Sequence, residues 1–338
     1  MALSVIIPFH NSSPEFNRCL EALARSDRAP EEVIAVDDGS TDASIEIARR
    51  FDVRIIQLID GPHGPAVARN RGAEVAAGDI LVFLDADVLI HKDTLRRIEE
   101  ILTNHPEITG LFGSYDEDPP HHGIVSHYKN LQHHYVHHHS QREASSFWAG
   151  CGAVRKDVFY RLGGFDESFQ RPSVEDIEFG LRMIRSGYRI WLCPEVQVTH
   201  LKRWTLTSWL RSDILDRAVP WSRLILTMSE IPADLNLDLK SRMSAMAAWI
   251  SVGCFLAGFW APGAWFVALL GMVVLGLLNS GLYRFFQQKV GILFAIQSFY
   301  LHFMYYLYSS LTFVMMFAWC WLMDRKGEKF RLSKRMER

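Results

Sequence analysis

The sequence predicts an α/β protein with a mainly parallel central sheet, followed by helices that associate with a membrane. Short apolar segments typical of buried strands alternate with amphipathic segments of about ten residues, and this alternation repeats four times. The second observation is the composition of residues 243–323, which are nearly all apolar or aromatic. We therefore expect one α/β domain and one membrane-associated region in the same chain.

The composition excludes several classes of protein. The chain has 338 residues and a net charge of −2, so no basic surface field favours nucleic acid as a partner. Its five cysteines are scattered without a CxxC pair, which indicates reduced thiols rather than a disulfide framework. The first residues lack the basic flank and the apolar length of a signal peptide, so we expect the α/β domain to stay in the cytoplasm.

The expected strands alternate in order with the expected helices. Strands are predicted at residues 3–8, 32–37, 53–57 and 81–84, and helices at 14–25, 42–51, 66–77 and 92–104. Pro8 halts the first strand, and Ser13 followed by Pro14 is typical of a helix start. Right-handed crossovers bring the carboxyl ends of parallel strands to one edge, where ligands bind. No GxGxxG sequence follows the first strand, which weakens a dehydrogenase interpretation.

Two aspartates lie directly after the fourth strand, in the segment LVFLDADV at 81–88. Asp85 and Asp87 are two positions apart, so their oxygens can point in the same direction. Two unpaired carboxylates at the end of a buried strand repel each other, and a hard divalent cation would relieve this repulsion. The alternative is a solvated acidic turn, and the spacing alone leaves both interpretations open.

Two segments in the middle of the chain also contain candidate residues. Eight histidines fall within residues 121–139; a zinc site is one interpretation, but the absence of Glu or Cys at ligand spacing favours a surface or substrate-facing helix. In the segment 146–156, Gly150 and Gly152 permit close backbone approach to a ligand, and a tight strand entry is the alternative.

An acidic pair opens the last predicted helix of the α/β domain. The spacing of Val174, Ile177 and Leu181 predicts an amphipathic helix over residues 174–188. Glu175 and Asp176 lie in its first turn, where the helix dipole alone could explain both acids. A strand is expected at residues 189–200, and it ends at His200.

Four segments together resemble glycosyltransferase family 2, the inverting, nucleotide-sugar-dependent transferases with the Rossmann-like A-type glycosyltransferase fold. They are SVIIPFHN at 4–11, VIAVDDGSTD at 33–42, ARNRGAEVAAGDILVFLDADV at 68–88, and GGFDESF at 163–169 with VEDIEFGLRMIRSGYRI at 174–190. The order and spacing of the four match the family, and the resemblance covers residues 3–205.

The resemblance implies a role for each matching residue. The nucleotide site, in which an aspartate of the 37–38 pair would accept from N3–H of uracil, would comprise Pro8, His10, Asn11, Asp37, Asp38, Arg69, Asn70, Asp85 and Ala86. Asp85-Ala86-Asp87 resembles the DxD motif that holds Mg²⁺ or Mn²⁺ against the diphosphate. His200 matches a histidine that completes the metal shell in some members. Asp176, beside Glu175, resembles the catalytic base.

The sequence departs from the family pattern at two places. His10 stands where a tyrosine is commoner, and Arg217 with Trp221 gives only a loose echo of the QxxRW motif, which argues against a processive polysaccharide synthase. The acceptor region is expected along Trp148, Gly150, Cys151, Gly152, Arg217 and Trp221.

The residue types fit sugar transfer independently of the family. A divalent ion held by two carboxylates neutralises a leaving diphosphate, and an inverting displacement needs only one base, whose pKa desolvation can raise. We therefore expect a metal-assisted, inverting transferase that uses a nucleotide sugar, and the uracil contact that the resemblance implies favours a UDP-linked one. A nucleotide-sugar-binding scaffold without turnover is the alternative from another class.

The C-terminal region is predicted to hold the enzyme at the inner or plasma membrane. Residues 243–260 and 264–283 carry no charge and are long enough for a transmembrane hairpin, and Arg242, Arg284 and Lys289 place both of its ends in the cytoplasm. Residues 206–240 are expected to be interfacial linker helices, because tryptophans alternate with basic residues there. An acceptor in the membrane plane, a lipid or a lipid-linked saccharide, would explain this arrangement. The sequence does not name the sugar or the oligomeric state.

The last predicted segments leave two topologies open. Residues 290–323 form either a third span or an interfacial helix with a re-entrant segment. Residues 324–338 carry seven Lys/Arg against three Asp/Glu, and such a basic tail favours the cytoplasm and hence the second topology.

Overall fold

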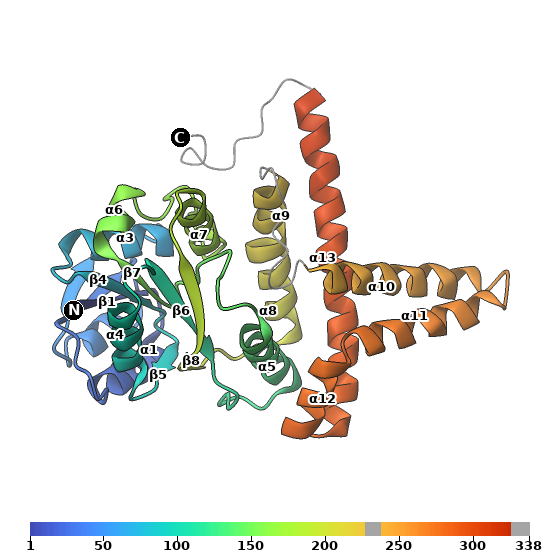
Figure 1. Ribbon diagram of the computed structural model, residues 1–338, viewed down its shortest axis with the longest axis horizontal. Helices are drawn as coiled ribbons and strands as arrows, with labels where there is room; N and C mark the ends of the chain where they lie inside the picture. Colours follow the sequence, from blue (N-terminus) through green and yellow to red (C-terminus); the bar gives the residue numbers. More distant parts are fainter. Residues whose placement is uncertain (227–237, 326–338) are drawn as a thin grey trace. The chain divides into compact units, whose positions relative to one another are not determined.

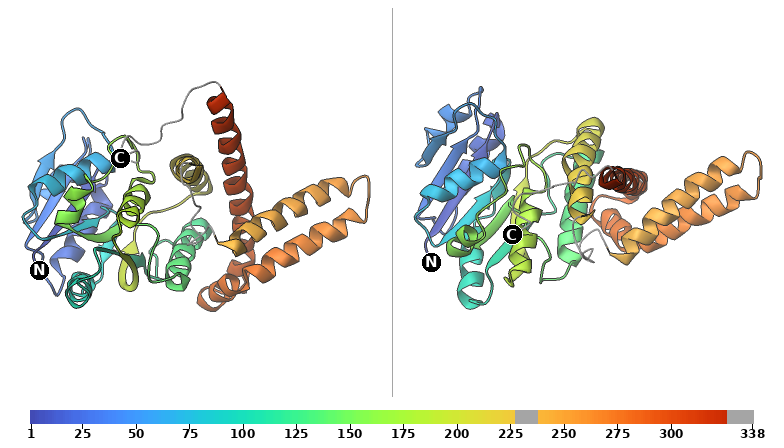
Figure 2. Two further views of the ribbon diagram at one scale, coloured as in Figure 1. Left: turned by 45° about the horizontal axis from the view of Figure 1, so that its top comes forward. Right: turned by 90° about the horizontal axis from the view of Figure 1, so that it is seen from above.

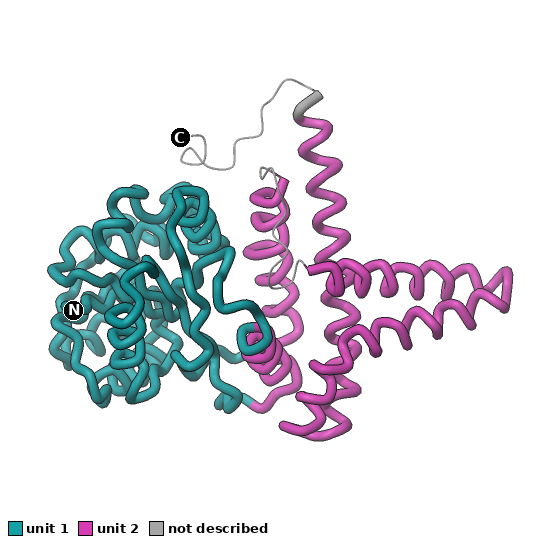
Figure 3. The backbone as a smooth tube through the Cα atoms, viewed as in Figure 1, with its two compact units in different colours: residues 1–121, 137–203, 333–338 teal, residues 122–136, 204–332 magenta. Residues whose placement is uncertain are grey.

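The computed structural model describes residues 1–226 and 238–325. The chain forms two compact units (Figure 3). Unit 1 comprises residues 1–121 and 137–203, and unit 2 comprises residues 122–136 together with the described residues from 204 on. The predicted end of the α/β domain at residue 205 stays a prediction. The assignment of residues 122–136 to unit 2 had no counterpart in the prediction.

Unit 1 is built on one sheet of eight strands in the order β3-β2-β1-β4-β7-β6-β8-β5 (Figure 1). The strands are β1 (Leu3–Phe9), β2 (Glu32–Asp37), β3 (Arg54–Gln57), β4 (Ile80–Leu84), β5 (Val88–Ile90), β6 (Gly110–Tyr115), β7 (Cys151–Arg155) and β8 (Ile190–His200). The first four are parallel, as predicted, whereas β7 runs antiparallel to both β4 and β6, and β5 antiparallel to β8. The sheet is therefore mixed.

Helices cover both faces of this sheet. They are α1 (Ser13–Ala24), α2 (Ser44–Ala48), α3 (Pro65–Val75), α4 (Thr94–Asn104), α6 (Lys156–Arg161) and α7 (Glu175–Arg185). The period of two along β1 explains the two layers: Val5 and Ile7 belong to the core that contains α1 and α4, while Ile6 belongs to the core that contains α3, α6 and α7. Both predicted faces of the α/β domain are therefore packed (Figure 2).

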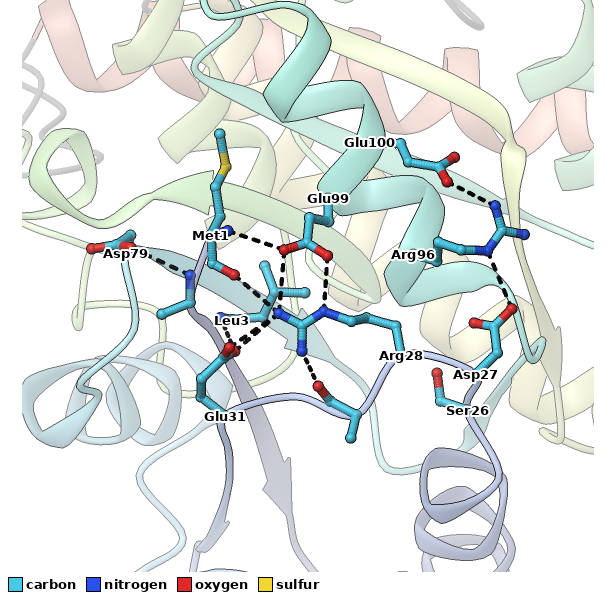
Figure 4. Close-up of polar contacts among 12 residues, drawn as sticks. Met1, Leu3, Ser26, Asp27, Arg28, Glu31, Asp79, Arg96, Glu99 and Glu100 are labelled. Atoms are coloured by element: carbon cyan, nitrogen blue, oxygen red, sulfur yellow. Dashed lines mark hydrogen bonds and ion pairs between the residues drawn. The ribbon is translucent and has the colours of Figure 1, made fainter.

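A polar network fixes the amino-terminal edge of the sheet, before β1 and β2 begin (Figure 4). The Arg28 guanidinium donates to Glu99 on α4 at 2.8 Å and to Glu31 at 3.0 Å. The amino group of Met1 lies 3.0 Å from the Glu99 carboxylate. Hydrogen bonds from Arg28, followed by smaller contributions from the chain's amino terminus, lower the pKa of Glu99 to about 2.

Replacing Arg28 with methionine is expected to destabilise unit 1 by about 1 kcal/mol, because a networked, partly buried ion pair contributes more than an exposed one. Glu99 has a folded-state pKa below its unfolded value, so its contribution is present above about pH 4.5 and is lost as pH falls toward 2. Thermal melts of the wild type and Arg28→Met at pH 7 and pH 3 should show a melting difference that narrows in acid. Arg96→Met serves as the control, because Arg96 lies on α4 with Glu99 but forms exposed ion pairs. It should change the melting temperature less, and an equal change would contradict the prediction.

Unit 2 is helical in its described residues. Its helices are the first part of α5 (Ile124–His139), α8 (Leu206–Arg211), the π-helical segment η1 (Ser212–Ala218), α9 (Val219–Leu226), α10 (Leu239–Ala257), α11 (Ala264–Leu278), α12 (Ser280–Lys289) and α13 (Ile292–Arg325). An aromatic core joins Tyr128 of α5, Trp209 of α8 and Phe286 of α12. At its margin the buried Asp213 carboxylate accepts from Lys129 at 3.0 Å and from the Trp209 indole at 2.8 Å. Trp209, from the predicted linker 206–240, thus belongs to a packed core.

The hairpin predicted between residues 243 and 283 forms, but its second arm ends early. Helices α10 and α11 run antiparallel, and the chain bends by 68° between α11 and α12. The Asn279 side chain lies at this bend, where its amide donates to the Leu275 carbonyl at 3.0 Å and to Ser244 of α10 at 2.9 Å. Helix α11 therefore ends at Leu278, before the predicted end of the arm at residue 283, and the span itself stays a prediction.

Small residues bring the two arms of the hairpin together. A Cβ atom added to Gly271 would overlap the Ser251 hydroxyl and lie 3.0 Å from the Ala247 carbonyl oxygen, so only glycine fits without a shift. A Cβ atom added to Gly276, on the same helix, would lie 3.7 Å from the Phe299 ring, which is an ordinary contact.

Gly271→Ala is expected to destabilise unit 2 by about 1–3 kcal/mol through overpacking, in spite of alanine's better helix propensity. Gly276→Ala, the matched control, should leave the stability unchanged or raise it by about 1 kcal/mol. Thermal unfolding of the detergent-solubilised chain, followed by size-exclusion chromatography, measures both. Equal behaviour of the two variants would show that the close approach at Gly271 is not required.

The last helix corrects a predicted topology. Residues 292–325 form one continuous helix of 34 residues, so the re-entrant segment that the basic tail favoured is wrong. No glycine or proline interrupts this stretch, which explains its continuity. Within the described residues, its segment Ile292–Met323 is long and apolar enough to cross a membrane, and the bent pair α11–α12 would be a second crossing if it acted as one span. The long helix is thus a candidate membrane anchor.

Candidate active site

The loops after β1 and β2 lie together at the carboxyl edge of the sheet. Asp38 accepts two backbone N–H bonds, from His63 at 2.8 Å and Gly64 at 2.7 Å, and Asp37 accepts from Ser40 at 2.9 Å. The Nδ1 atom of His10 is 2.9 Å from the Asp38 carbonyl oxygen. These bonds hold the turn after β2 against the loop that leads into α3.

Two other predicted nucleotide-site residues have structural contacts. The Asn11 side-chain oxygen accepts the N–H groups of Thr41 and Asp42 at 2.8 and 3.2 Å, and Pro8 is buried within β1. The Asn11 contacts leave its side chain committed to the start of α2. Roles for Pro8, His10, Asn11, Asp37 and Asp38 in nucleotide binding stay predictions.

Asp85, Ala86 and Asp87 form a turn between β4 and β5. The Asp85 carboxylate accepts from Arg69 at 2.7 Å, and its backbone N–H donates to the Gly150 carbonyl at 3.2 Å. Asp87 lies 3.5 Å from Nε2 of His200, because β5 pairs with the end of β8. Burial alone would raise the pKa of Asp87, but the charge and hydrogen bond of His200 outweigh it and lower this pKa.

Tyr115 holds the His200 ring in place. The two rings are stacked with their centroids 4.4 Å apart and 7° between their planes. Tyr115 ends β6, a strand that had no counterpart in the sequence prediction. The sequence carried no sign of this contact, since β6 and β8 are distant in the chain.

Asp176 lies in the first turn of α7 with both carboxylate oxygens directed by backbone groups. It accepts from Ala149 at 3.0 Å and from Ile177 at 2.8 Å. Burial, and next the charge of Glu175, raise the pKa of Asp176 to about 7, while Arg69 and the two N–H groups act in the opposite direction. A carboxylate that titrates near neutral pH suits a general base.

Glu175 is directed away from this role. It is buried, and its two oxygens accept from Arg69 at 2.8 Å and from the Ser173 N–H at 2.9 Å. These contacts tie Glu175 to Arg69 and to the start of its own helix, and its catalytic role stays a prediction.

Two links bring the turn after β4 and the start of α7 into one site. Arg69 bonds to Asp85 with one nitrogen and to Glu175 with the other. The neighbouring residues Ala149 and Gly150 form the second link through the backbone. The Ala149 N–H donates to the Asp176 carboxylate, and the Gly150 carbonyl accepts from the Asp85 N–H. The turn after β4 and the start of α7 are therefore linked twice, and the roles predicted for their acids stay predictions.

The Asn70 side chain bonds to the loop that precedes α7. Its amide accepts from the Phe165 N–H and donates to the Phe165 carbonyl, both at 2.9 Å, and it also donates to Glu167. Asn70 thus clamps the GGFDE loop to α3, and these contacts do not favour the nucleotide contact predicted for it.

The glycines predicted to admit a ligand instead admit side chains of the protein. The indole of Trp148 occupies the space above Gly150, and the ring of Phe147 occupies that above Gly152. Burial raises the pKa of Cys151, on β7, to about 12, so its thiol is unreactive. Arg217 and Trp221 belong to unit 2, on η1 and α9, and their place in the acceptor region stays a prediction.

The histidines of α5 pack among aromatic rings. His134 stacks on Phe285 of unit 2 with centroids 5.7 Å apart, and His137 of unit 1 contacts the Gly113 carbonyl at 3.0 Å. Across residues 1–226 and 238–325, no group of three His, Cys, Asp or Glu side chains has the geometry to hold a metal ion. The zinc interpretation of residues 121–139 therefore has no support.

Comparisons with known proteins identify the domain. The family model described as glycosyl transferase family 2 matches residues 4–163. Validoxylamine A glucosyltransferase of Streptomyces hygroscopicus subsp. limoneus is 30% identical over 228 residues, which cover 55% of this chain and 48% of that protein. The chain spans about half or less of the length of the first curated relatives that it matches.

Solved structures share the fold. The mannosyltransferase PcManGT of Pyrobaculum calidifontis, in complex with GDP-Man and Mn²⁺, has a TM-score of 0.56 at 19% identity and covers 88% of this chain and 85% of its own. Residues 1–349 of TarS from S. aureus, in complex with UDP-GlcNAc, have a TM-score of 0.51 at 19% identity and cover 98% and 93%. The chain therefore carries a domain of glycosyl transferase family 2, with the A-type glycosyltransferase fold.

Proposed function

We propose that this chain transfers a sugar from a nucleotide sugar to an acceptor hydroxyl with inversion at the anomeric carbon. The observation that supports the proposal is the pair of links, Arg69 and the 149–150 backbone, that join the turn of Asp85 to the start of α7, where Asp176 lies. Asp176 takes the proton of the acceptor hydroxyl while the acceptor oxygen bonds to the anomeric carbon. The bond from that carbon to the diphosphate breaks, and the nucleoside diphosphate leaves.

The donor is proposed to be a UDP-sugar. Asp37 and Asp38 lie at the carboxyl ends of the first strands, where the family resemblance puts the uracil contact. The Nε–H of Arg69 is buried without a hydrogen-bond partner among the described residues. Such a group costs about 1–3 kcal/mol unless a ligand accepts from it, and a diphosphate oxygen is a suitable acceptor.

A divalent cation, Mg²⁺ or Mn²⁺, is proposed to assist. Asp85, Asp87 and His200 would hold it, and their oxygen and imidazole donors suit these ions. The three side chains do not have the geometry of a metal site in the described structure, so they would have to move together when the ion binds. The distance of 3.5 Å between the Asp87 carboxylate and Nε2 of His200 fits two ligands of one ion. The Asp85 carboxylate already accepts from Arg69, so it would have to bind the ion and Arg69 at the same time. When bound, the ion would neutralise the charge that develops on the leaving diphosphate.

The acceptor is proposed to be a lipid or a lipid-linked saccharide at a membrane that unit 2 enters. No charged residue occurs between Arg242 and Arg284, and large apolar side chains are exposed along the hairpin, Trp260 being 85% exposed. The 19 residues of α10 extend about 28 Å, close to the hydrocarbon core of about 30 Å. The basic flanks would keep both ends in the cytoplasm, on the side of the catalytic unit.

Within unit 2, α13 runs across the hairpin rather than along it (Figures 1 and 2). A flat bilayer crossed by the hairpin would therefore have α13 along its surface. By length and composition it is α13 that meets the requirement for a span, and α10 does not. We favour the hairpin because its apolar stretch is bounded by basic residues at both ends, and because the tail of seven Lys/Arg would stay inside.

Single cysteines at Gly263, in the hairpin turn, and at Leu332, in the tail, test this topology with a membrane-impermeant maleimide on intact cells. The proposal expects labelling at position 263 and none at 332 until the cells are permeabilised. The reverse result would make α13 the span.

The transfer itself is tested with the purified full chain in detergent. UDP-sugars are supplied singly with Mn²⁺ and a membrane lipid extract, free UDP is measured, and the labelled product is identified by mass spectrometry. Release of UDP with a labelled lipid supports the proposal. Binding of UDP without release under every donor would instead indicate a nucleotide-sugar-binding scaffold, and a labelled soluble acceptor would overturn the lipid assignment.

A further inference from the structure

Arg69 is the only cation that bonds directly to acids of both halves of the candidate site among the hydrogen bonds of the described residues. It comes from α3, whereas its partners follow β4 and begin α7, 16 and 106 residues away. The Glu175 end is buried, with 5% of the side chain exposed; Asp85 has 35% exposed. The bridge is therefore anchored at α7 and open to ligands at the turn.

The surroundings of Arg69 hold its guanidinium in one place. The central carbon lies 5.6 Å from the centroid of the Phe165 ring, on the loop that Asn70 clamps to the same helix. Because Asn70 is the next residue along α3, the clamp and the bridge fix one another. A guanidinium can bond to two carboxylates in different directions, and an ammonium cannot reproduce this planar geometry.

We propose that Arg69 is a positioning residue for the transfer: its guanidinium ties the donor-side turn of Asp85 to the acceptor-side helix of Asp176 through Glu175. The proposal rests on the function proposed above. Arg69 does not touch the acceptor proton. It aligns the two segments, and its charge, together with that of Glu175, acts on the base across the site.

The charges around Asp176 make this testable by sign. After burial, the largest influences on the pKa of Asp176 are Glu175, which raises it, and Arg69, which lowers it, followed by the N–H groups of Ala149 and Ile177, which also lower it. Removing the charge of Glu175 should therefore lower the pKa of Asp176, and removing the charge of Arg69 should raise it. Opposite shifts would show that both charges act on Asp176, and a lower kcat in Arg69→Lys, which keeps the charge, would show that the planar bridge itself is needed.

The experiment measures kcat/KM for donor turnover against pH in the full chain, with Arg69→Met, Glu175→Gln and Arg69→Lys. The acid limb should move to higher pH by about one unit in Arg69→Met and to lower pH by about one unit in Glu175→Gln. Arg69→Lys keeps the charge, so its limb should stay near that of the wild type, while kcat falls about tenfold because one ammonium cannot hold both carboxylates.

Circular dichroism melts establish that each variant is folded, and Arg69→Lys with Glu175→Gln carries the test if Arg69→Met does not fold. Limbs that move in the same direction, limbs that stay in place, or an unchanged kcat in Arg69→Lys would overturn the positioning role. Absence of turnover in the wild type with every donor would instead contradict the proposed function, so the two failures are distinguishable.

Discussion

Asp176→Asn is expected to lower sugar transfer by about 10²- to 10⁴-fold while the protein stays folded, because the reaction loses its general base. Asparagine has nearly the same volume, and its side-chain oxygen can still accept from the Ala149 or Ile177 N–H group. The variant removes the proton acceptor and leaves the packing at the start of α7 in place.

The loss should appear in kcat rather than in donor affinity. UDP binding, measured by calorimetry, is expected to stay within about threefold of the wild type, because the Asp176 carboxylate accepts its hydrogen bonds from Ala149 and Ile177, neither of which is predicted to bind the nucleotide. In the wild type, kcat/KM should fall as the pH drops through about 7, since the protonated carboxyl cannot accept the acceptor's proton.

Asp157→Asn removes the same charge from an exposed position on α6 and serves as the control. Its rate should match the wild type at every pH. A transfer rate of Asp176→Asn within tenfold of the wild type, with an unchanged melting temperature, would show that another group removes the proton.

The parallel half of the sheet could be predicted because its strands leave a local pattern. β1 is buried along all seven of its residues, and β4 along all five, so each forms an apolar run bounded by turn residues. The antiparallel β7 has no such mark. It inserts between β4 and β6 only through contacts across the sheet, and β6 itself was not predicted.

The acids of the site could be predicted, but their partners could not. Asp85, Asp87 and Asp176 stand out by residue type and by place in their elements. The partner of Glu175 lies 106 residues away, and the group that orients Asp176 is a backbone N–H, which every residue other than proline has.

The glycines of the 146–156 segment were a misleading signal, because the sequence does not show which group packs against them. Gly150 and Gly152 need the absence of a side chain, as predicted, but Trp148 and Phe147 occupy the space that it provides. Sequence identifies where a side chain is not tolerated, and only the packing identifies what approaches instead.

Asp87→Asn is expected to raise the cation concentration needed for half-maximal rate by about 10- to 100-fold, through loss of a proposed carboxylate ligand. His200 reaches Asp87 at 3.5 Å and is otherwise held by its stack on Tyr115, so its ring stays in place while its charge partner is lost. Binding of Mn²⁺ in the absence of donor, followed by electron paramagnetic resonance, should weaken in parallel.

Removal of divalent ions with a chelator should abolish transfer by the wild type, and Mn²⁺ or Mg²⁺ should restore it. Asp79→Asn is the matched control, because Asp79 precedes the same strand, β4, at the opposite edge of the sheet, where it accepts from the Ala2 N–H. Its cation dependence should equal that of the wild type. Transfer that persists in chelator, or an Asp87→Asn variant with unchanged Mn²⁺ binding, would show that the turn after β4 acts on the diphosphate through Arg69 and not through a metal.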